Sequence, residues 1–448
     1  MSRPDPARMA AYEVLRAVRV EDAYANLVLP RLLREHGLTG RDAAFATELA
    51  SGTLRRRGTY DAILDACTDR PLATTAAKVV DALRLGAHQL LAMRVPPHAA
   101  ISTTVDLVRD RAGKGASGFA NAVLRRVGGR DLDAWLDELA PSGSDADLAV
   151  RHSHPAWVVA ALREALDGAD DELAALLAAD NAAPAVTLVA RPGRISRDAL
   201  LDQVGVGGGG TPTALSKRGV TMTGGDPGAV PAVAAGDAGV QDEGSQLVAL
   251  ALARAPLTGS DARWLDLTAG PGGKAALLAG LGAQRGALLT AVEKQPHRAD
   301  LVRRALRGAE GVAEVLTADG TDPGLEAGSF DRVLVDAPCS GLGALRRRPE
   351  ARWRRTAADV DDLVPLQRAL LDSALRLVRP GGVVLYATCS PLLAETRDVV
   401  APVAARDDVT LEPCPMPVDA PGPLPGTTQL WPHRHGTDAM FAALLRRT

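Results

Sequence analysis

The stretch RWLDLTAGPGGK, residues 263–274, decides the fold of the C-terminal half of this 448-residue chain. It joins a short apolar segment, typical of a buried strand, to a glycine-rich turn and then to a helical pattern that runs to about Leu281. Strand and helix patterns then alternate, with strands predicted at 287–292, 313–317, 330–335 and 382–387 and helices at 297–306, 363–378 and 395–405. Such alternation is typical of a parallel sheet that is covered on both faces. We therefore predict a doubly wound α/β domain over residues 240–448.

The preceding residues predict two further parts. Apolar stripes at helical spacing, for example Ala10, Val14, Leu15 and Val18, predict an all-α domain over residues 1–140 with six or seven helices. Residues 145–239 mix helical patterns at 157–166, 171–180 and 196–203 with a strand at 185–189, a glycine run at 207–210 and short strands. This second part is predicted to be a small α+β module.

The composition describes a globular protein, with 46% hydrophobic and 23% charged residues. No apolar run approaches the roughly 20 residues that span a bilayer, and the first residues lack the apolar stretch of a secretory signal. The chain has four cysteines, and none of them belongs to a cluster with metal-ligand spacing. We expect a cytoplasmic protein with free thiols, no bound metal and no membrane partner.

The charge is unevenly distributed along the chain. Residues 1–127 carry 19 basic and 13 acidic side chains, whereas the whole chain has a net charge of −3. A basic module joined to an acidic one points modestly to a polyanionic partner, although the same charges could simply lie on solvated helix faces.

Three strand-end features indicate a ligand that contains adenosine. The glycine turn allows a ligand to approach the backbone, and the helix after it offers free N–H groups. Glu293 follows the second predicted strand about twenty residues later, where a carboxylate can accept hydrogen bonds from a ribose. Asp319 follows the third strand, where it could receive an adenine amino group. Either carboxylate alone could instead cap the next helix.

Two cysteines follow two other predicted strands, in Asp336-Ala337-Pro338-Cys339-Ser340-Gly341 and in Ala387-Thr388-Cys389-Ser390. If these strands are neighbours in a parallel sheet, both thiols reach the crevice in which such sheets bind ligands. A thiolate there is a strong nucleophile, and a second thiol beside an aspartate suggests a covalent adduct that must later be released. Cys67 and Cys414 have no motif around them and are expected to be structural.

These motifs resemble those of the S-adenosylmethionine-dependent RNA cytosine-5 methyltransferases, and within them the Sun/Fmu type that acts on bacterial small-subunit (16S) ribosomal RNA. The resemblance lies in the glycine turn, in DAPCSG at 336–341 and in TCS at 388–390. GFANAVLRR at 118–126 is similar to part of the NusB-like RNA-binding domain that this type carries at its N-terminus, and VQDEGSQ at 240–246 is similar to the start of its catalytic domain. Thr268-Ala269-Gly270 replaces the usual Cys-Ala-Ala, and Thr396 stands where Asn is common.

The resemblance implies a Rossmann-like methyltransferase domain and a role for each site residue. It implies that Cys389 attacks C6 of the cytosine, that Cys339 assists breakdown of the adduct, and that Asp336 contacts the ring edge near N3. The resemblance also implies that S-adenosylmethionine is bound by the glycine turn and by three strand-end carboxylates. The turn residues are Thr268, Ala269, Gly270, Pro271, Gly272, Gly273 and Lys274, and the carboxylates are Glu293, Asp319 and Asp336.

An arginine-rich segment directly after the Cys339 motif, RRRPEARWRR at 346–355, suits phosphate contacts and base stacking. We therefore predict RNA contacts by Arg346, Arg347, Arg348, Arg352, Arg354 and Arg355, and by Arg298 after the second strand. A solvated basic loop is the alternative.

Other functions remain possible from the residues alone. A DNA cytosine methyltransferase would make Cys339 the attacking residue, and a non-catalytic RNA-binding or antitermination factor would use only the first domain. A small-molecule methyltransferase would leave the two thiols and the arginine segment without a role. A monomer that acts on 16S ribosomal RNA is the prediction carried forward.

Overall fold

The computed structural model describes residues 4–206 and 209–448, so Gly207 and Gly208 of the expected glycine run lie outside the described residues. The chain forms two compact units. The first contains Met1–Ala182 together with a later segment, Leu345–Arg354, and the second contains Ala183–Ala344 and Arg355–Thr448.

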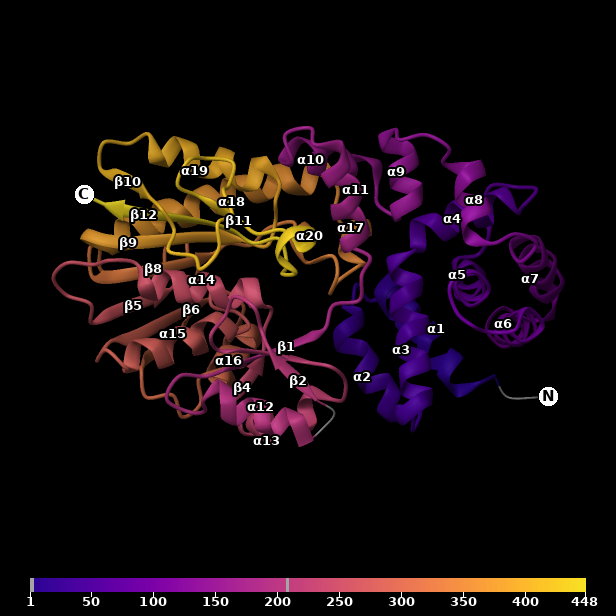
Figure 1. Ribbon diagram of the computed structural model, residues 1–448, viewed down its shortest axis with the longest axis horizontal. Helices are drawn as coiled ribbons and strands as arrows, with labels where there is room; N and C mark the ends of the chain where they lie inside the picture. The colour runs from indigo at the N-terminus through magenta and orange to yellow at the C-terminus, as the bar shows by residue number, and fades with distance from the viewer. Residues whose placement is uncertain (1–3, 207–208) are drawn as a thin grey trace. The chain divides into compact units, whose positions relative to one another are not determined.

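The first unit is helical, as predicted (Figure 1). Its helices are α1 (Pro6–Val20), α2 (Ala25–Glu35), α3 (Gly40–Arg55), α4 (Arg57–Ala66), α5 (Ala77–Leu91), α6 (Pro97–Ala112), α7 (Lys114–Val127), α8 (Leu132–Leu139), α9 (Asp145–His152), α10 (Ala156–Ala165), α11 (Asp170–Ala179) and α17 (Ala351–Arg354), with a 3-10 turn at Leu72–Thr74. Helix α1 begins where sequence rules place it, because the Asp5 side chain accepts a hydrogen bond from Arg8 N at 2.9 Å and Pro6 occupies the first turn.

The predicted apolar stripes form the core of this unit. Ala10, Val14, Leu15 and Val18 on α1 are all buried, and the last three belong to one hydrophobic cluster that also includes Val79, Val80 and Leu83 of α5. The periodicity of the sequence therefore located the buried faces of these helices correctly.

The helical unit extends further along the chain than expected. Helix α9 joins α4, since Thr59 Oγ1 donates to Val150 O at 2.6 Å and Gly58 N donates to Ser153 Oγ at 2.8 Å. The boundary therefore falls near Ala182 rather than at residues 140–145. Of the helices expected in the middle module, those at 157–166 and 171–180 belong to the first unit, and the one at 196–203 belongs to the second.

The second unit contains two sheets. The smaller one is antiparallel with strand order β2-β3-β1-β4, and it consists of β1 (Val186–Ala190), β2 (Gly210–Pro212), β3 (Gly219–Met222) and β4 (Ala238–Val240) with α12 (Arg197–Val206), a 3-10 turn at Pro227–Ala229 and α13 (Pro231–Ala235). It is tied to α14 (Glu243–Arg254), because Glu243 Oε1 accepts from Leu215 N at 2.7 Å and Ser216 N at 2.6 Å. This small sheet therefore belongs to the same unit as the main sheet.

The main sheet has the order β10-β12-β9-β8-β5-β6-β7, and β11 pairs with β12. Its strands are β5 (Arg263–Asp266), β6 (Leu288–Glu293), β7 (Val312–Thr317), β8 (Phe330–Asp336), β9 (Val378–Thr388), β10 (Val409–Glu412), β11 (Thr428–Gln429) and β12 (Phe441–Arg447). Strands β5 to β9 pair in parallel, as predicted. The order reverses between β5 and β8, and the carboxyl ends of strands at such a point form the crevice where this class of fold binds ligands.

Helices cover both faces of the main sheet (Figure 1). One face packs against α14, α15 (Gly273–Ala283) and α16 (Pro296–Ala305), and the other packs against α18 (Ala357–Leu377) and α19 (Arg397–Ala404); short helical turns lie at Leu342–Ala344, Leu393–Glu395 and α20 (Pro432–His435). Side chains of β9 alternate between the two cores, with Leu385 on the first face and Val384 and Tyr386 on the second.

The last apolar run of the chain forms β12, which lies antiparallel between β9 and β10. The purely parallel sheet that we predicted is therefore mixed at one edge. An antiparallel pair needs no crossover helix, so strand–helix alternation gives no signal for it.

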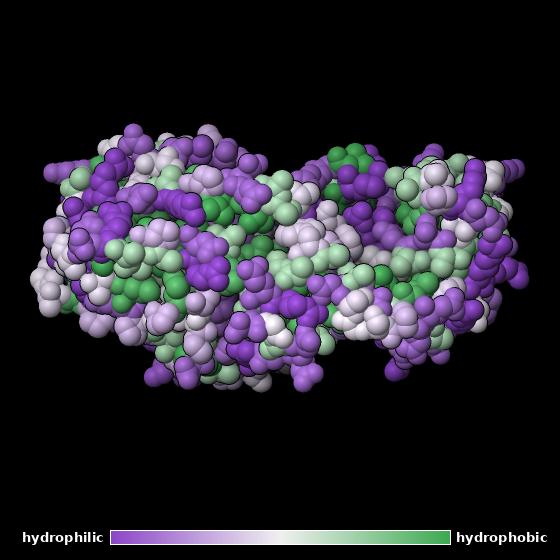
Figure 2. All heavy atoms as spheres, turned by 90° about the horizontal axis from the view of Figure 1, so that it is seen from above, coloured by the Kyte–Doolittle hydropathy of each residue, from purple (hydrophilic) through white to green (hydrophobic). Residues whose placement is uncertain are grey.

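The face drawn in Figure 2 shows hydrophilic residues across most of the surface, with hydrophobic residues scattered among them. Over residues 4–206 and 209–448, no helix is both long and apolar enough to cross a membrane. Within the same residues there is no group of three or more His, Cys, Asp or Glu side chains that could hold a metal ion.

Candidate active site

The two motif cysteines lie side by side at the carboxyl ends of neighbouring strands. Strands β8 and β9 are parallel, with Asp336 in register with Ala387. Cys339 Sγ lies 3.5 Å from Cys389 Sγ, and both residues are free thiols with partly exposed side chains. The predicted meeting of the two thiols in one crevice is thus observed.

Backbone hydrogen bonds fix the two cysteine loops against each other. Ala337 N donates to Ala387 O at 2.8 Å, and Gly343 N donates to Cys389 O at 2.9 Å. A Cβ at Gly343 would lie 2.8 Å from Cys389 O and 2.2 Å from Ala439 O, so a glycine is required for this close approach. The sulfur–sulfur distance is therefore set by strand pairing and by one obligatory glycine.

A partly buried ion pair borders the thiols. Lys274, at the start of α15, donates to Asp336 Oδ2 at 2.8 Å. Burial alone would lower the pKa of Lys274, but the charge and hydrogen bond of Asp336, together with the negative form of Cys389, raise it. Lys274 therefore stays protonated, and its positive charge acts on the Cys389 sulfur.

Asp266, which the sequence reasoning did not select, ends β5 beside this ion pair. Its side chain is fully buried, Oδ1 accepts a 3.3 Å bond from Thr268 N, and Oδ2 has no hydrogen-bond partner. Burial and the charge of Asp336 raise the pKa of Asp266 to about 7. The signal in the sequence was a carboxylate directly after the apolar residues Trp264 and Leu265.

The glycine turn has the shape of a cradle beside Glu293. A Cβ at Gly270 would lie 2.0 Å from Glu293 Oε2, so only glycine lets the loop lie against that carboxylate. Arg298 Nη2 donates to Gly270 O at 2.7 Å, and Arg298 Nε lies 3.6 Å from Glu293 Oε2. Arg298, predicted as an RNA contact, thus braces the turn and the carboxylate.

The other residues of the turn are held by the backbone and lead into α15. Ala269 N donates to Val292 O at 2.8 Å, Gly272 has a φ of 106°, and Gly273 is the first residue of the helix. Pro271 follows a cis peptide bond, and the buried hydroxyl of Thr268 has no hydrogen-bond partner. The orphaned hydroxyl, the helix N-terminus and the glycine cradle fit a polar, adenosine-containing cofactor.

Asp319 lies beyond β7, next to Lys294 after β6. Lys294 Nζ lies 2.8 Å from Asp319 Oδ2, and the amide and hydroxyl of Thr321 donate to Oδ1 at 3.0 and 2.9 Å. These bonds, that from Lys294 first, lower the pKa of Asp319 to about 2. Glu293 and Asp319 therefore end adjacent strands, as the sequence predicted.

Comparison with known proteins identifies the family. Residues 254–446 match the family model "16S rRNA methyltransferase RsmB/F", and residues 5–128 match the NusB family. A Mycobacterium tuberculosis protein named as a methyltransferase is 54% identical over 449 residues, which cover 99% of this chain and 97% of that protein. The ribosomal RNA small subunit methyltransferase B of Pseudomonas putida is 33% identical over 445 residues, 98% of each chain.

The chain belongs to the 16S rRNA methyltransferase RsmB/F family. It is an RNA methyltransferase that uses S-adenosylmethionine, and its N-terminal helical domain is NusB-like. The solved structure of PH0851 has the same fold, with a TM-score of 0.83, 22% identity and coverage of 100% of both chains. The resemblance recognised in the sequence motifs is confirmed.

The arginine segment of this RsmB/F family member holds both buried and exposed side chains. Leu345–Arg354 is part of the helical unit, where Arg352 is fully buried. Its guanidinium donates to Asn181 Oδ1 at 2.8 Å, Ser153 O at 3.0 Å and Asp180 O at 3.3 Å. Arg352 therefore makes hydrogen bonds within the interior of the helical unit. The structure does not support the predicted contact between Arg352 and an RNA phosphate.

The neighbouring arginines differ in exposure. Arg346 is only 8% exposed, and Arg354 donates to Ala23 O and pairs with Asp22 at 2.9 Å. Arg348 is exposed and lies over the ring of Tyr24 at 4.8 Å. Arg347 and Arg355 are partly exposed. An RNA contact remains a prediction for Arg347, Arg348, Arg355 and Arg298.

Glu395 is a second residue that the sequence reasoning missed. Its carboxylate is fully buried and accepts from Ser340 N at 2.7 Å, from Ser340 Oγ at 2.5 Å and from Gln367 Nε2 at 3.0 Å. The residue lies six positions after Cys389 but holds the loop of Cys339. An acidic side chain within the buried run around Leu392 and Thr396 was the available signal.

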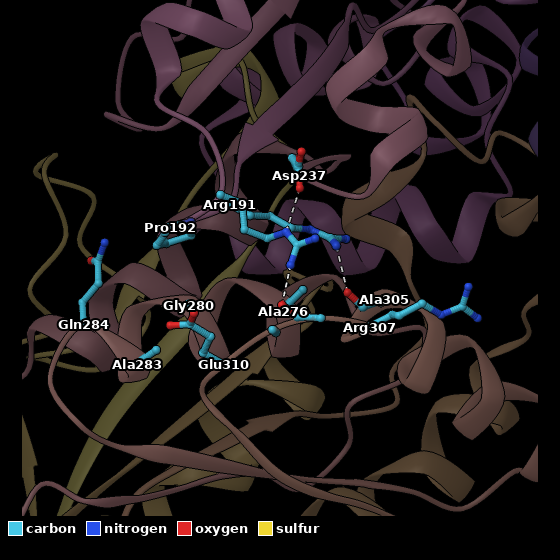
Figure 3. Close-up of a pocket in the computed structure, with 14 residues that line it drawn as sticks. Arg191, Pro192, Asp237, Ala276, Gly280, Ala283, Gln284, Ala305, Arg307 and Glu310 are labelled. Atoms are coloured by element: carbon cyan, nitrogen blue, oxygen red, sulfur yellow. Dashed lines mark hydrogen bonds and ion pairs between the residues drawn. The ribbon is translucent and has the colours of Figure 1, made fainter.

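A cavity of about 350 Å³ lies beside the C-terminal parts of α15 and α16, against the small sheet (Figure 3). Arg191 donates to Ala305 O and Gly236 O, both at 2.8 Å, and Arg194 Nε donates to Asp237 Oδ1 at 2.8 Å. Because the last carbonyls of a helix lack partners within it, Arg191 completes the end of α16 and attaches the small sheet to it. This cavity belongs to the seam between the sheets and not to the thiol site.

Proposed function

We propose that this enzyme methylates C5 of a cytosine in 16S ribosomal RNA through a covalent bond between Cys389 and C6. The observation that carries the proposal is a pair of free thiols 3.5 Å apart, bordered by the partly buried Lys274–Asp336 ion pair at 2.8 Å. A methyltransferase acting on an amine or a hydroxyl needs no thiol pair, whereas a weakly nucleophilic ring carbon needs covalent activation.

The Cys389 thiolate adds to C6, and the electron pair of the C5–C6 double bond moves toward C5 and the N3 edge of the ring. S-adenosylmethionine supplies the methyl group that C5 receives. The C5 proton then leaves to water, its electron pair restores the C5–C6 double bond, and the C6–sulfur bond breaks to return the Cys389 thiolate. The residues around the sulfur stabilise both the attack and the departure.

Lys274 and Asp336 are suited to the attack step. The Lys274 ammonium favours the thiolate of Cys389, since opposite charge stabilises an ionised thiol. Asp336 would contact the ring edge near N3, and the Lys274 ammonium bonded to it would stabilise the negative charge that develops there.

Cys339 is suited to the release step. A hydrogen bond to Cys389, burial and the charge of Glu395 raise the pKa of Cys339, so it carries its proton at neutral pH. From 3.5 Å its S–H can donate to the departing sulfur of Cys389. Removing that donor would slow release more than attack.

The cofactor would be held by the turn from Thr268 to Lys274, by Glu293 through the ribose and by Asp319 through the adenine amino group. The cradle at Gly270, the unpaired Asp266 Oδ2 and the free helix N-terminus support this assignment. The target base must leave its stack to reach the thiols, which single-stranded or hairpin RNA makes cheap.

The NusB-like domain and the exposed arginines, Arg347, Arg348, Arg355 and Arg298, are proposed to contact the RNA backbone. Binding should then weaken steeply with salt. A monomer in the cytoplasm remains the prediction for assembly and location.

The attack step is tested by Cys389→Ser. We expect no transfer of labelled methyl groups to ribosomal RNA, with S-adenosylmethionine binding retained in an equilibrium titration, because Cys389 acts on the base rather than on the cofactor. Undiminished transfer by this variant would overturn the assignment of the nucleophile.

The release step is tested by Cys339→Ser. We expect a protein–RNA adduct that survives a denaturing gel, because methylation proceeds while departure of the sulfur is slowed. If no adduct accumulates at single turnover, Cys339 has no part in release.

The nucleic acid is tested with ribosomal RNA against duplex DNA of the same sequence. We expect labelled 5-methylcytosine in the RNA only, mapped by bisulfite sequencing. Methylation of the duplex through Cys339 would favour a DNA methyltransferase instead.

A further inference from the structure

The two sulfurs of the thiol pair face opposite charges. Lys274, from the start of α15, acts on Cys389, while Glu395, from the turn Leu393–Glu395, acts on Cys339. Two thiols at 3.5 Å compete for ionisation, because two adjacent negative charges repel. The surrounding charges therefore decide which sulfur keeps its proton.

Glu395 is built into the loop of Cys339. Both of its oxygens accept bonds from Ser340, the residue after Cys339, and Oε1 also accepts from Gln367 Nε2 of α18. Gln367 Nε2 donates at 2.9 Å to Pro338 O as well, which is the residue before Cys339. Glu395 and Gln367 together thus hold the loop on both sides of the cysteine.

All three donors to this carboxylate are electrically neutral, so hydrogen bonds hold its charge without cancelling it. The side chain is fully buried, where screening by water is weak. Tyr386 of β9 faces the same space; its hydroxyl donates to Glu395 O at 2.9 Å, and burial, then Cys339, then Glu395 raise its pKa. Tyr386 is therefore neutral and adds no compensating charge.

The remaining charged groups lie on the other side. Lys274 is paired with Asp336, and Asp266 and Glu293 lie beyond them at the ends of β5 and β6. The Lys274 ammonium thus interacts with Cys389, whereas the buried Glu395 carboxylate interacts with Cys339.

We propose that Glu395 is a positioning residue that keeps the shared proton on Cys339, so that Cys389 is the sulfur that ionises and reacts. The functional role of this proton location rests on the proposed covalent mechanism. The location itself can be measured without RNA or cofactor. It explains how two cysteines in contact take different parts in one reaction.

The test uses limited alkylation of the full-length protein by iodoacetamide, with the modified residue identified by mass spectrometry across a range of pH. In the native enzyme we expect Cys389 to react about tenfold faster than Cys339 near pH 8, since one pKa unit changes the thiolate fraction about tenfold. Two other cysteines provide slow internal references: Cys67, which is buried, and Cys414, whose pKa is raised by burial to about 12.

The variant Glu395→Gln removes the charge and keeps the shape, because the amide can still accept from Ser340 N. We expect Cys339 to gain about tenfold in alkylation rate and the preference for Cys389 to fall accordingly. The matched control is Ser340→Ala, which removes one bond to Glu395 and leaves its charge in place, so the preference should persist.

An unchanged preference in Glu395→Gln, or an equal loss in Ser340→Ala, would overturn the proposal. If Glu395→Gln does not fold, the native enzyme still decides the matter, since coincident pH profiles for the two cysteines would contradict it. The alkylation could clearly prefer Cys389 while the Cys389→Ser variant still transfers methyl groups fully. That result would leave the assignment of the proton to Cys339 intact and refute only the proposed covalent attack by Cys389.

Discussion

Asp266→Asn is expected to stabilise the enzyme at high pH and to have a smaller effect at low pH. The pKa of Asp266 rises from 3.8 to about 7 on folding because of its burial and of Asp336. The folded state therefore binds this proton more tightly than the unfolded state, and the associated stability is lost as pH rises from about 4 to about 7. A shift of about three units is worth roughly 4 kcal/mol in total.

Between about pH 5 and pH 8 the native protein should lose roughly 2–3 kcal/mol of that stability, whereas asparagine cannot ionise. The asparagine oxygen can still accept from Thr268 N. Chemical denaturation of both proteins without cofactor, at each pH, should show the difference in unfolding free energy growing by that amount.

Asp319→Asn is the control for this measurement. Its pKa is lowered to about 2, so Asp319 is ionised in the folded and unfolded states throughout the same window. It should add no pH dependence there. A difference between Asp266→Asn and the native protein that is equal at both pH values would refute the argument that Asp266 takes up a proton on folding.

Three further substitutions have defined outcomes. Arg352→Lys should lower the unfolding free energy by about 2–4 kcal/mol, because one ammonium cannot satisfy the acceptors of the buried guanidinium. The measurement is a denaturation followed by the circular dichroism of the helices. The control is Arg355→Lys at a partly exposed position, which should change the unfolding free energy by less than about 0.5 kcal/mol. Gly270→Ala should weaken S-adenosylmethionine binding at least about tenfold in a titration, since the new methyl group would displace the Glu293 carboxylate. Lys274→Gln should slow alkylation of Cys389 at fixed pH about tenfold, and an unchanged rate would mean that the ammonium does not favour the thiolate.

The sequence correctly predicted the site residues that lie at the carboxyl ends of the predicted strands. Cys339, Cys389, Glu293 and Asp319 each follow a strand of a parallel sheet, and all carboxyl ends of such strands share one edge. Their proximity therefore follows from the alternation of strands and helices alone. The register of β8 with β9 then brings the two sulfurs together.

Residues whose partners are distant in sequence could not be predicted in the same way. Arg352 finds its acceptors at Ser153 and Asn181, roughly 200 and 170 positions away. A side chain that the sequence predicted to contact RNA therefore supports the interior of the helical unit instead. Glu395 depends on Ser340 and Gln367 from two other segments. Local patterns carry no information about such contacts.

The carboxylates of the site limit one another. Asp336 raises the pKa of Asp266, and Glu293 raises it further, while Lys274, the lysine beside them, is bonded to Asp336. A single ammonium cannot neutralise three neighbouring carboxylates, so the arrangement of lowest free energy leaves one of them protonated. Asp266 is the most buried and has an unpaired oxygen, which makes it the one that takes the proton. The Lys274 charge then remains available to Asp336 and to the Cys389 sulfur, where the proposed reaction needs it.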